Sequence, residues 1–220
     1  MNHAITVGVV DSEALVRGGI RRVLEQAPDV RVVAEAASGP GAVELVRKHL
    51  PRVLLMDVRM PGMDGLAAAE QVRALSAGTA VVLLTSVADD SHIRRAVRAG
   101  ATGFLLKDGS PRELVTAVRA VAAGEAMLSP AITRRVLDRI VDIDPEPVER
   151  ARTLVNHLTG REREVLGLLA QGMGNLQIAR KLYLSEGAVK AHVSRLLTKL
   201  SCDNRVQAAI LAHNARLVSA

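Results

Sequence analysis

The sequence predicts an α/β domain followed by an all-α domain. Over residues 1–125, short runs of Val, Leu and Ile alternate with amphipathic stretches. Runs that are apolar along their whole length are typical of parallel strands buried on both faces. From residue 154 onward the apolar spacing is helical only. We therefore expect one domain over 1–125, a helical segment and linker over 126–153, and a second domain over 154–220.

Five apolar runs define the strands of the first domain: Ile5–Val10, Val30–Ala34, Val53–Met56, Ala80–Leu84 and Gly103–Leu106. The stretches between these runs have helical spacing, as in Leu114, Val118 and Val121. Five strand–helix units predict an open, doubly wound parallel sheet with right-handed crossovers.

The connecting segment is predicted from its composition. Helical character continues through roughly Ser129–Val141, and the polar stretch Asp142–Pro147 follows it with two prolines. Proline cannot extend a helix, so we expect Asp142–Pro147 to be the linker between the domains.

Four short helices are predicted within Leu158–Val218. Thr159 can cap the first helix, with Glu162 three residues later completing a capping box. Asn175 and Ser185 can cap the second and third helices.

The third helix has two contrasting faces. Its apolar face carries Val189, Val193, Leu196 and Leu200. Its other face carries Lys190, Ala191, Ser194, Arg195 and Thr198. Two short helices joined by a turn form a helix-turn-helix, and the second can enter the major groove of DNA. The alternative is a small bundle with solvated charges.

The positive charge is concentrated in the second domain. The net charge of +6 divides into +1 for residues 1–125 (15 basic, 14 acidic), 0 for 126–153 (five of each) and +5 for 154–220 (nine basic, four acidic). This asymmetry indicates a polyanion partner for the second domain. Phe104 and Tyr183 are too few aromatic side chains for the stacking that grips single strands, so duplex DNA is favoured.

Composition also excludes several classes of protein. The apolar runs are too short to span a bilayer, and the first residues lack the pattern of a signal peptide. Cys202 is the single cysteine, which excludes internal disulfides and thiolate-clustered zinc. We expect a cytoplasmic protein without membrane contact.

Four polar residues end the apolar runs of the first domain: Asp11, Asp57, Thr85 and Lys107. Ligands of open parallel sheets bind at the carboxyl ends of the strands, so these side chains should converge there. A carboxylate can accept a phosphoryl group, a second carboxylate can hold Mg²⁺, and lysine and hydroxyl groups can bind phosphoryl oxygens. Each residue alone has an ordinary structural interpretation, but four at corresponding strand ends predict a phosphoryl-transfer site.

Two segments of the first domain resemble receiver domains of the NarL/FixJ subfamily. Asp57–Gly65 after a buried strand resembles the phosphoacceptor segment, and Ala99–Asp108 resembles the lysine segment. The resemblance implies a flavodoxin-like (βα)5 receiver domain in which Asp57 is the phosphoacceptor, Thr85 the switch hydroxyl and Lys107 the phosphate partner.

The resemblance also implies roles for two further residues. Phe104 occupies the aromatic switch position, with ordinary core packing as the alternative. The backbone carbonyl of Arg59 is implied as an Mg²⁺ ligand beside Asp11 and Asp57.

This chain departs from the receiver pattern after its first strand. Family members usually carry two consecutive acids, whereas this chain has Asp11-Ser12-Glu13. Ser12 offers no charge, so it is a weak or absent ligand and Mg²⁺ affinity should fall; it could also serve as a helix N-cap. Regulation without phosphate, by a ligand, a partner or dimerisation, is therefore the alternative.

The second domain resembles the LuxR-type DNA-binding domain. The resemblance is carried by Leu158–Leu166, Asn175–Ala179, Leu184–Val193 and Asn204–Ala208. Gly160, Gly187 and Ala188 depart from common family residues, which bears on affinity and sequence preference.

The LuxR resemblance implies residues for two surfaces. Base or groove contacts would come from Lys190, Ala191 and Ser194, and phosphate contacts from Asn175, Arg195 and Lys199. The last helix would pair two copies through Val206, Ala209, Ile210 and His213. Such a dimer reads half-sites about 34–36 Å apart.

Together these resemblances imply a DNA-binding transcriptional response regulator, switched by a sensor histidine kinase and not an enzyme. A haloacid-dehalogenase-like phosphatase would need an acid where Arg59 stands. A flavodoxin-like cofactor binder would need a Ser/Thr/Gly loop where Asp11–Ala14 stands.

Overall fold

A computed structural model of the chain describes residues 4–86, 92, 95–96, 99–128, 145–202 and 204–217. The chain forms two compact units, Met1–Thr133 and Arg134–Ala220.

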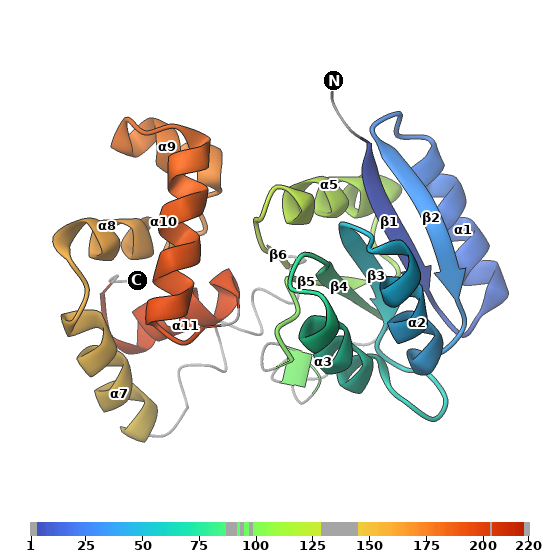
Figure 1. Ribbon diagram of the computed structural model, residues 1–220, viewed down its shortest axis with the longest axis horizontal. Helices are drawn as coiled ribbons and strands as arrows, with labels where there is room; N and C mark the ends of the chain where they lie inside the picture. Colours follow the sequence, from blue (N-terminus) through green and yellow to red (C-terminus); the bar gives the residue numbers. More distant parts are fainter. Residues whose placement is uncertain are drawn as a thin grey trace. The chain divides into compact units, whose positions relative to one another are not determined.

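The first unit contains a parallel sheet with strand order β2-β1-β3-β4-β5-β6 (Figure 1). The strands are β1 (Ile5–Val10), β2 (Val30–Ala36), β3 (Val53–Asp57), β4 (Ala80–Thr85), β5 (Gly103–Leu106) and β6 (Met127–Leu128). The five predicted strands and the doubly wound parallel fold are confirmed. The sixth strand was not predicted, because two residues are too few to give a pattern.

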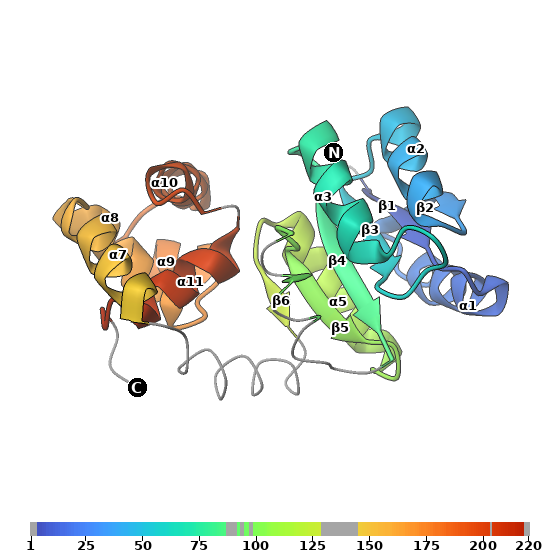
Figure 2. The ribbon, with the colours of Figure 1, turned by 90° about the horizontal axis from the view of Figure 1, so that it is seen from below.

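Helices cover both faces of this sheet (Figure 2). They are α1 (Ala14–Glu25), α2 (Gly39–His49), α3 (Gly65–Leu75) and α5 (Pro111–Ala122). Buried residues of α1 and α5, such as Leu24 and Val118, pack with Val7, Leu55 and Leu84 of the sheet. Helices α2 and α3 contact each other, and they lie on the opposite face.

The start of α1 differs from one sequence interpretation. The N-cap residue is Glu13, which makes no side-chain cap bond, so the assignment of Ser12 as a cap is wrong. The Asp11 carboxylate accepts a hydrogen bond from the Glu13 backbone N–H at 2.9 Å, which starts the helix one residue later.

The described residues of the second unit form helices joined by short turns, with no strand among them. Its helices are α7 (Pro145–Asn156), α8 (Gly160–Ala170), α9 (Asn175–Leu182), α10 (Glu186–Lys199) and α11 (Arg205–Asn214). The expectation that 145–147 belong to a non-helical linker is wrong. A helix can begin with proline, because the first N–H groups of a helix have no partner within it. The helix predicted over Ser129–Val141 lies outside the described residues.

One apolar core unites the second unit. Val155 of α7 belongs to the same buried cluster as residues of all four following helices, among them Leu166, Ile178, Leu196 and Ala208. Helix α7 thus runs across residue 154, the predicted start of this domain.

The predicted caps are mostly correct. Thr159 and Glu162 form the capping box of α8, and the Ser185 hydroxyl accepts from Ala188 N–H at 3.2 Å. Asn175, however, is the first residue of α9 and not its cap. The Gln177 side chain accepts instead from Gly174 N–H at 2.9 Å, which places the cap one residue earlier.

Candidate functional site

The three charged residues predicted to converge in the first unit lie together. Lys107 Nζ is 2.6 Å from Asp11 Oδ2 and 3.0 Å from Asp57 Oδ2. Asp57 ends β3, while Asp11 and Lys107 directly follow β1 and β5. Both aspartate side chains are buried, and that of Lys107 is 14% exposed. The carboxyl ends of three strands therefore build one compact ion-pair cluster.

Thr85 and Phe104 lie next to this cluster in the sheet. Thr85 ends β4, between β3 and β5, and its carbonyl accepts from Lys107 N–H at 2.8 Å. Phe104 is only 2% exposed and pairs with Leu83 of β4. The burial of Phe104 agrees with core packing in this conformation.

The segment that follows Asp57 folds back, so that Gly65 lies against the backbone of Asp57 and Val58. Gly65 N–H donates to the Val58 carbonyl at 2.9 Å. A Cβ atom at Gly65 would lie 2.0 Å from the Asp57 carbonyl oxygen. Asp64 caps α3 by accepting from Ala67 N–H at 2.8 Å. Only glycine at 65 allows α3 to begin against the strand that carries Asp57, a requirement that the sequence alone did not reveal.

The surroundings of Lys107 favour its charged ammonium form. Burial by itself lowers the pKa of Lys107, but hydrogen bonds and charge interactions with Asp11 and Asp57 outweigh it. The net result is a Lys107 pKa above its ordinary value. The ammonium thus balances one of two adjacent negative charges.

The donor set meets the minimum needs of Mg²⁺. Asp11 and Asp57 supply two carboxylates, and oxygen donors are what Mg²⁺ prefers. Ser12 and Glu13 are exposed, so neither adds a buried ligand. Within the described residues, no third His, Cys, Asp or Glu side chain joins them to form a metal-binding group. The two carboxylates are suitable ligands for the ion, but they carry less negative charge than a set with a third acid would.

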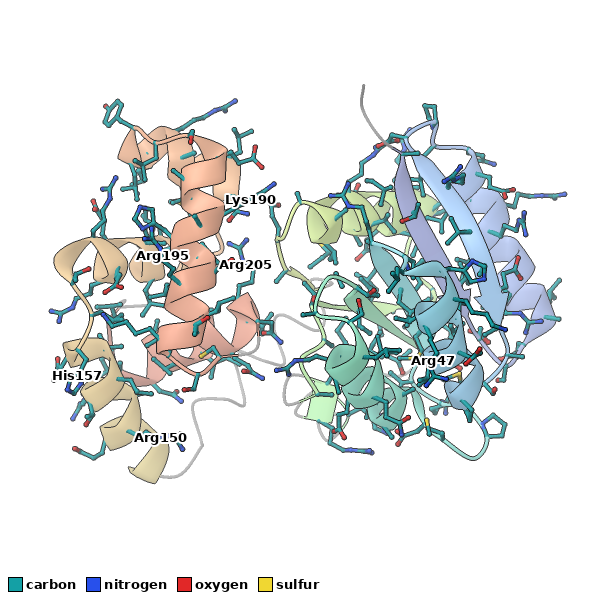
Figure 3. The ribbon with its side chains drawn as sticks, in the orientation of Figure 1. Arg47, Arg150, His157, Lys190, Arg195 and Arg205 are labelled. Carbon is teal, nitrogen blue, oxygen red and sulfur yellow. The ribbon has the colours of Figure 1, made fainter. Side chains whose placement is uncertain are left out.

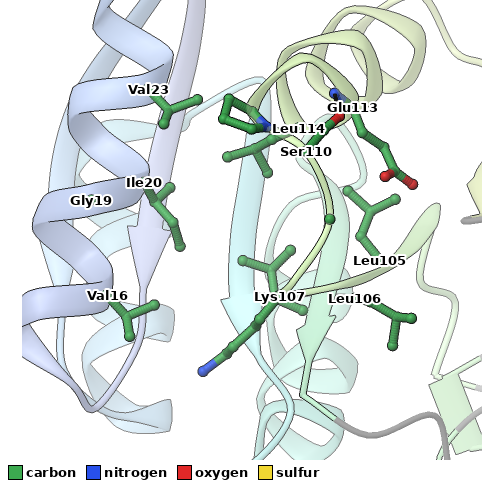
Figure 4. Close-up of a pocket in the computed structure, with 13 residues that line it drawn as sticks. Val16, Gly19, Ile20, Val23, Leu105, Leu106, Lys107, Ser110, Glu113 and Leu114 are labelled. Carbon is green, nitrogen blue, oxygen red and sulfur yellow. Dashed lines mark hydrogen bonds between the residues drawn. The ribbon is translucent and has the colours of Figure 1, made fainter.

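A cavity of about 240 Å³ adjoins the cluster. Val16, Ile20 and Val23 of α1 face Leu114 and the Lys107 stem across it (Figure 4). Its lining is mainly apolar, and the Lys107 stem is what it shares with the ion-pair cluster.

Helix α10 has the two faces that the sequence predicted. Val189, Val193 and Leu196 are buried, while Lys190, Ala191, Ser194, Arg195 and Thr198 are exposed. Lys190 and Arg195 project from this helix (Figure 3). Their partners lie within α10: Lys190 Nζ is 3.0 Å from Glu186, and Arg195 Nε donates to the Ala191 carbonyl at 3.3 Å. The exposed face is small, polar and basic.

Of the residues predicted to contact phosphate, Asn175 is buried and Lys199 is paired with a side chain of another helix. Asn175 is only 2% exposed, so its side chain does not lie on the surface with Arg195. Lys199 Nζ is 2.8 Å from the Glu162 carboxylate of α8.

Two long-range side-chain contacts of the second unit were missed from the sequence. Arg161 donates to the Leu182 carbonyl at 3.0 Å, and the buried Arg205 donates to the Met173 carbonyl at 2.5 Å. Neither contact has a periodic signal, because each pairs a side chain with a distant backbone carbonyl.

The predicted pairing face of α11 is partly available. Ala209, Ile210 and His213 are of intermediate exposure. Val206 is 8% exposed and turns largely inward.

Comparison with known families gives two matches along the chain. Residues 7–119 match the response regulator receiver domain, and residues 156–212 match the bacterial regulatory proteins of the luxR family. None of the helices in the described residues is long and apolar enough to cross a membrane.

Whole-chain relatives have the same organisation. The nitrate/nitrite response regulator protein NarL of Escherichia coli K12 is 37% identical over 212 residues, which is 96% of each chain. The crystal structure of the response regulator ChrA, from a heme-sensing two-component system, is 34% identical, covers 98% of this chain and 99% of its own, and has a TM-score of 0.53. The signal receiver domain of the response regulator NarL of Mycobacterium tuberculosis is 41% identical over 56% of this chain and 99% of its own, with a TM-score of 0.54.

Regulators of this type are transcription factors and not enzymes, as the sequence predicted. Receiver domains typically bind Mg²⁺ at the phosphorylation site. The chain belongs to the NarL-type response regulators, with a receiver domain followed by a LuxR-family helix-turn-helix that binds DNA.

Proposed function

We propose that this protein regulates transcription in response to phosphorylation of Asp57 by a sensor histidine kinase. The observation that carries the proposal is the position of Asp57, whose carboxylate lies 3.0 Å from Lys107 Nζ beside buried Asp11. In the transfer, an Asp57 oxygen forms a bond to phosphorus while the bond from phosphorus to the kinase imidazole nitrogen breaks.

Neighbouring groups would stabilise the acyl phosphate. The Lys107 ammonium moves from the Asp57 carboxylate to a phosphoryl oxygen and keeps Asp11 as its second partner. The Thr85 hydroxyl donates to another phosphoryl oxygen, and Phe104 repacks with it as the aromatic switch. Asp11, Asp57 and the Arg59 carbonyl would hold Mg²⁺, which when bound neutralises charge on the phosphoryl oxygens.

The output would be binding of duplex DNA by α10. Lys190, Ala191 and Ser194 face the groove, and Arg195 contacts phosphate; all four are exposed. A second copy pairs through Ala209, Ile210 and His213 of α11. Both the DNA and the kinase domain that donates phosphoryl groups are cytoplasmic, so we place the protein there.

We also propose the domain limits. The receiver domain occupies 1–125 and the DNA-binding domain 154–220, joined by 126–153. Helix α7 (Pro145–Asn156) overlaps the second boundary, so a DNA-binding fragment should include it.

Treatment with a small-molecule acyl phosphate and Mg²⁺ tests the first half of the proposal. A gel that retards phosphoproteins should resolve a second species for the wild type and none for Asp57→Asn. A wild type that stays unphosphorylated, or an Asp57→Asn variant that is equally labelled, would contradict it.

A second candidate is a regulator of the same DNA-binding type whose receiver works without phosphate. It is favoured by the exposure of Ser12 and by Lys107, which is already ion-paired with both Asp11 and Asp57. Ser12→Asp distinguishes the two. It should tighten Mg²⁺ binding through one added carboxylate. If only Ser12→Asp becomes phosphorylated, regulation without phosphate is the better account.

A further inference from the structure

Lys199 and Glu162 join the end of α10 to the start of α8. Lys199 Nζ lies 2.8 Å from Glu162 Oε2. The same oxygen accepts from Thr159 N–H at 2.8 Å and from the Thr159 hydroxyl at 2.9 Å. Lys199 is therefore bound to a carboxylate that the capping box already holds in place.

The two helix ends are electrostatically matched. Glu162 lies in the first turn of α8, where a negative charge is favourable, and Lys199 lies in the last turn of α10, where a positive charge is favourable. Lys199 first, and then the Thr159 hydrogen bonds, lower the pKa of Glu162 to about 2. Both side chains are partly exposed, so the pair adds little to overall stability. Its effect is mainly on where the end of α10 lies.

The other cations of α10 behave differently. Glu186, the partner of Lys190, lies four residues away on the same helix, and Arg195 donates to a carbonyl of its own helix. Those contacts leave the side chains on the exposed face of α10. Lys199 is instead turned toward a different helix.

We propose that Lys199 is a positioning residue: its ion pair with Glu162 fixes the C-terminal end of the recognition helix against α8, and it is not a phosphate contact. The inference rests on the proposed binding of DNA by α10. It reassigns one residue that the family resemblance places at the DNA backbone.

The salt dependence of DNA binding separates the two roles. Each phosphate contact adds about 0.9 to the slope of log K against log salt. We would measure binding of the full chain to a random-sequence duplex over a salt series, for wild type, Lys199→Met and Arg195→Met. Arg195→Met, the control on α10 that removes a proposed phosphate contact, should reduce the slope by about 0.9. Lys199→Met should keep the wild-type slope but weaken binding about two- to fivefold at every salt concentration.

Two further variants make the test specific. Lys199→Arg keeps the ion pair and should restore affinity. Glu162→Gln keeps the capping box, since glutamine also serves there. It should weaken binding as Lys199→Met does, and the double variant should be no weaker than either single one. A thermal unfolding curve of each variant checks that the variant is folded at the assay temperature.

Three results would overturn the inference. A slope reduced by about 0.9 in Lys199→Met would make Lys199 a phosphate contact. Tighter binding by Glu162→Gln would mean that Glu162 only screens such a contact. Unchanged affinity in Lys199→Met would leave the ion pair without a role in DNA binding. A flat salt response of the wild type is a separate result, because it removes the proposed DNA-binding face and the positioning role with it.

Discussion

The two units of this protein use the same kind of ion pair in opposite settings. In the receiver, Lys107 joins two buried aspartates at 2.6 and 3.0 Å. In the DNA-binding unit, Lys199 joins the partly exposed Glu162 at 2.8 Å. Similar distances therefore carry different energies, because a buried charge that loses its partner is far more costly than an exposed one. We propose that the buried Lys107 cluster takes part in phosphoryl transfer. The exposed Lys199–Glu162 pair instead positions the end of a helix.

The largest effect should follow removal of the buried cation. Lys107→Met leaves Asp11 and Asp57 adjacent and unbalanced, which should lower the free energy of unfolding by about 3–5 kcal/mol in urea titrations at neutral pH without metal. Lys199→Met is the exposed counterpart and should change it little. Because the Lys107 pKa is raised, its contribution is complete below the ordinary pKa of 10.5 and is lost as pH rises through the raised value. Equal stability of Lys107→Met and wild type would contradict the comparison.

Gly65 tests how tightly the receiver site is packed. Gly65→Ala should destabilise the receiver by about 1–3 kcal/mol, because the new Cβ would meet the Asp57 carbonyl oxygen at 2.0 Å. Gly18→Ala in α1 is the control: its Cβ would meet nothing within 4 Å, and alanine should stabilise the helix by up to about 1 kcal/mol. Urea unfolding of both variants measures this. A harmless Gly65→Ala would mean that α3 can shift away from Asp57.

Arg195 tests the exposed face of α10. Arg195→Ala should reduce the salt slope of duplex binding by about 0.9, since one phosphate contact is lost. Arg47→Ala removes another exposed arginine, from α2 of the receiver, and should leave the slope unchanged. Equal slopes for Arg195→Ala and wild type would place the DNA on another surface.

The smallest effect concerns Glu162 and pH. Its pKa is lowered from 4.5 to about 2, so its contribution to stability is present above pH 4.5 and is lost as pH falls through about 2. The difference in thermal midpoint between wild type and Glu162→Gln should therefore shrink between pH 5 and pH 2. A difference that stays constant would show that the carboxylate charge has no part in the contact.

The sequence predicted the features that follow from the spacing of apolar residues and from the residues at strand ends. Asp11, Asp57 and Lys107 were found because the ends of parallel strands meet at one edge, and the buried face of α10 because its spacing is helical. Contacts between side chains and distant groups have no such signal, so Glu162–Lys199, Arg205–Met173 and the close passage of Gly65 appeared only in three dimensions. The predicted Ser12 and Asn175 caps were wrong by one residue each, because the helices begin after Glu13 and Gly174.

The central claim is that the state of Asp57 in one unit controls DNA binding by the other. The direct measurement is the affinity of the full chain for its own promoter DNA, with and without an acyl phosphate donor and Mg²⁺, for wild type and Asp57→Asn. We predict that the donor changes the affinity of the wild type and leaves that of Asp57→Asn unchanged. An identical response of the two proteins, or no response in a wild type shown to be phosphorylated, would contradict the account.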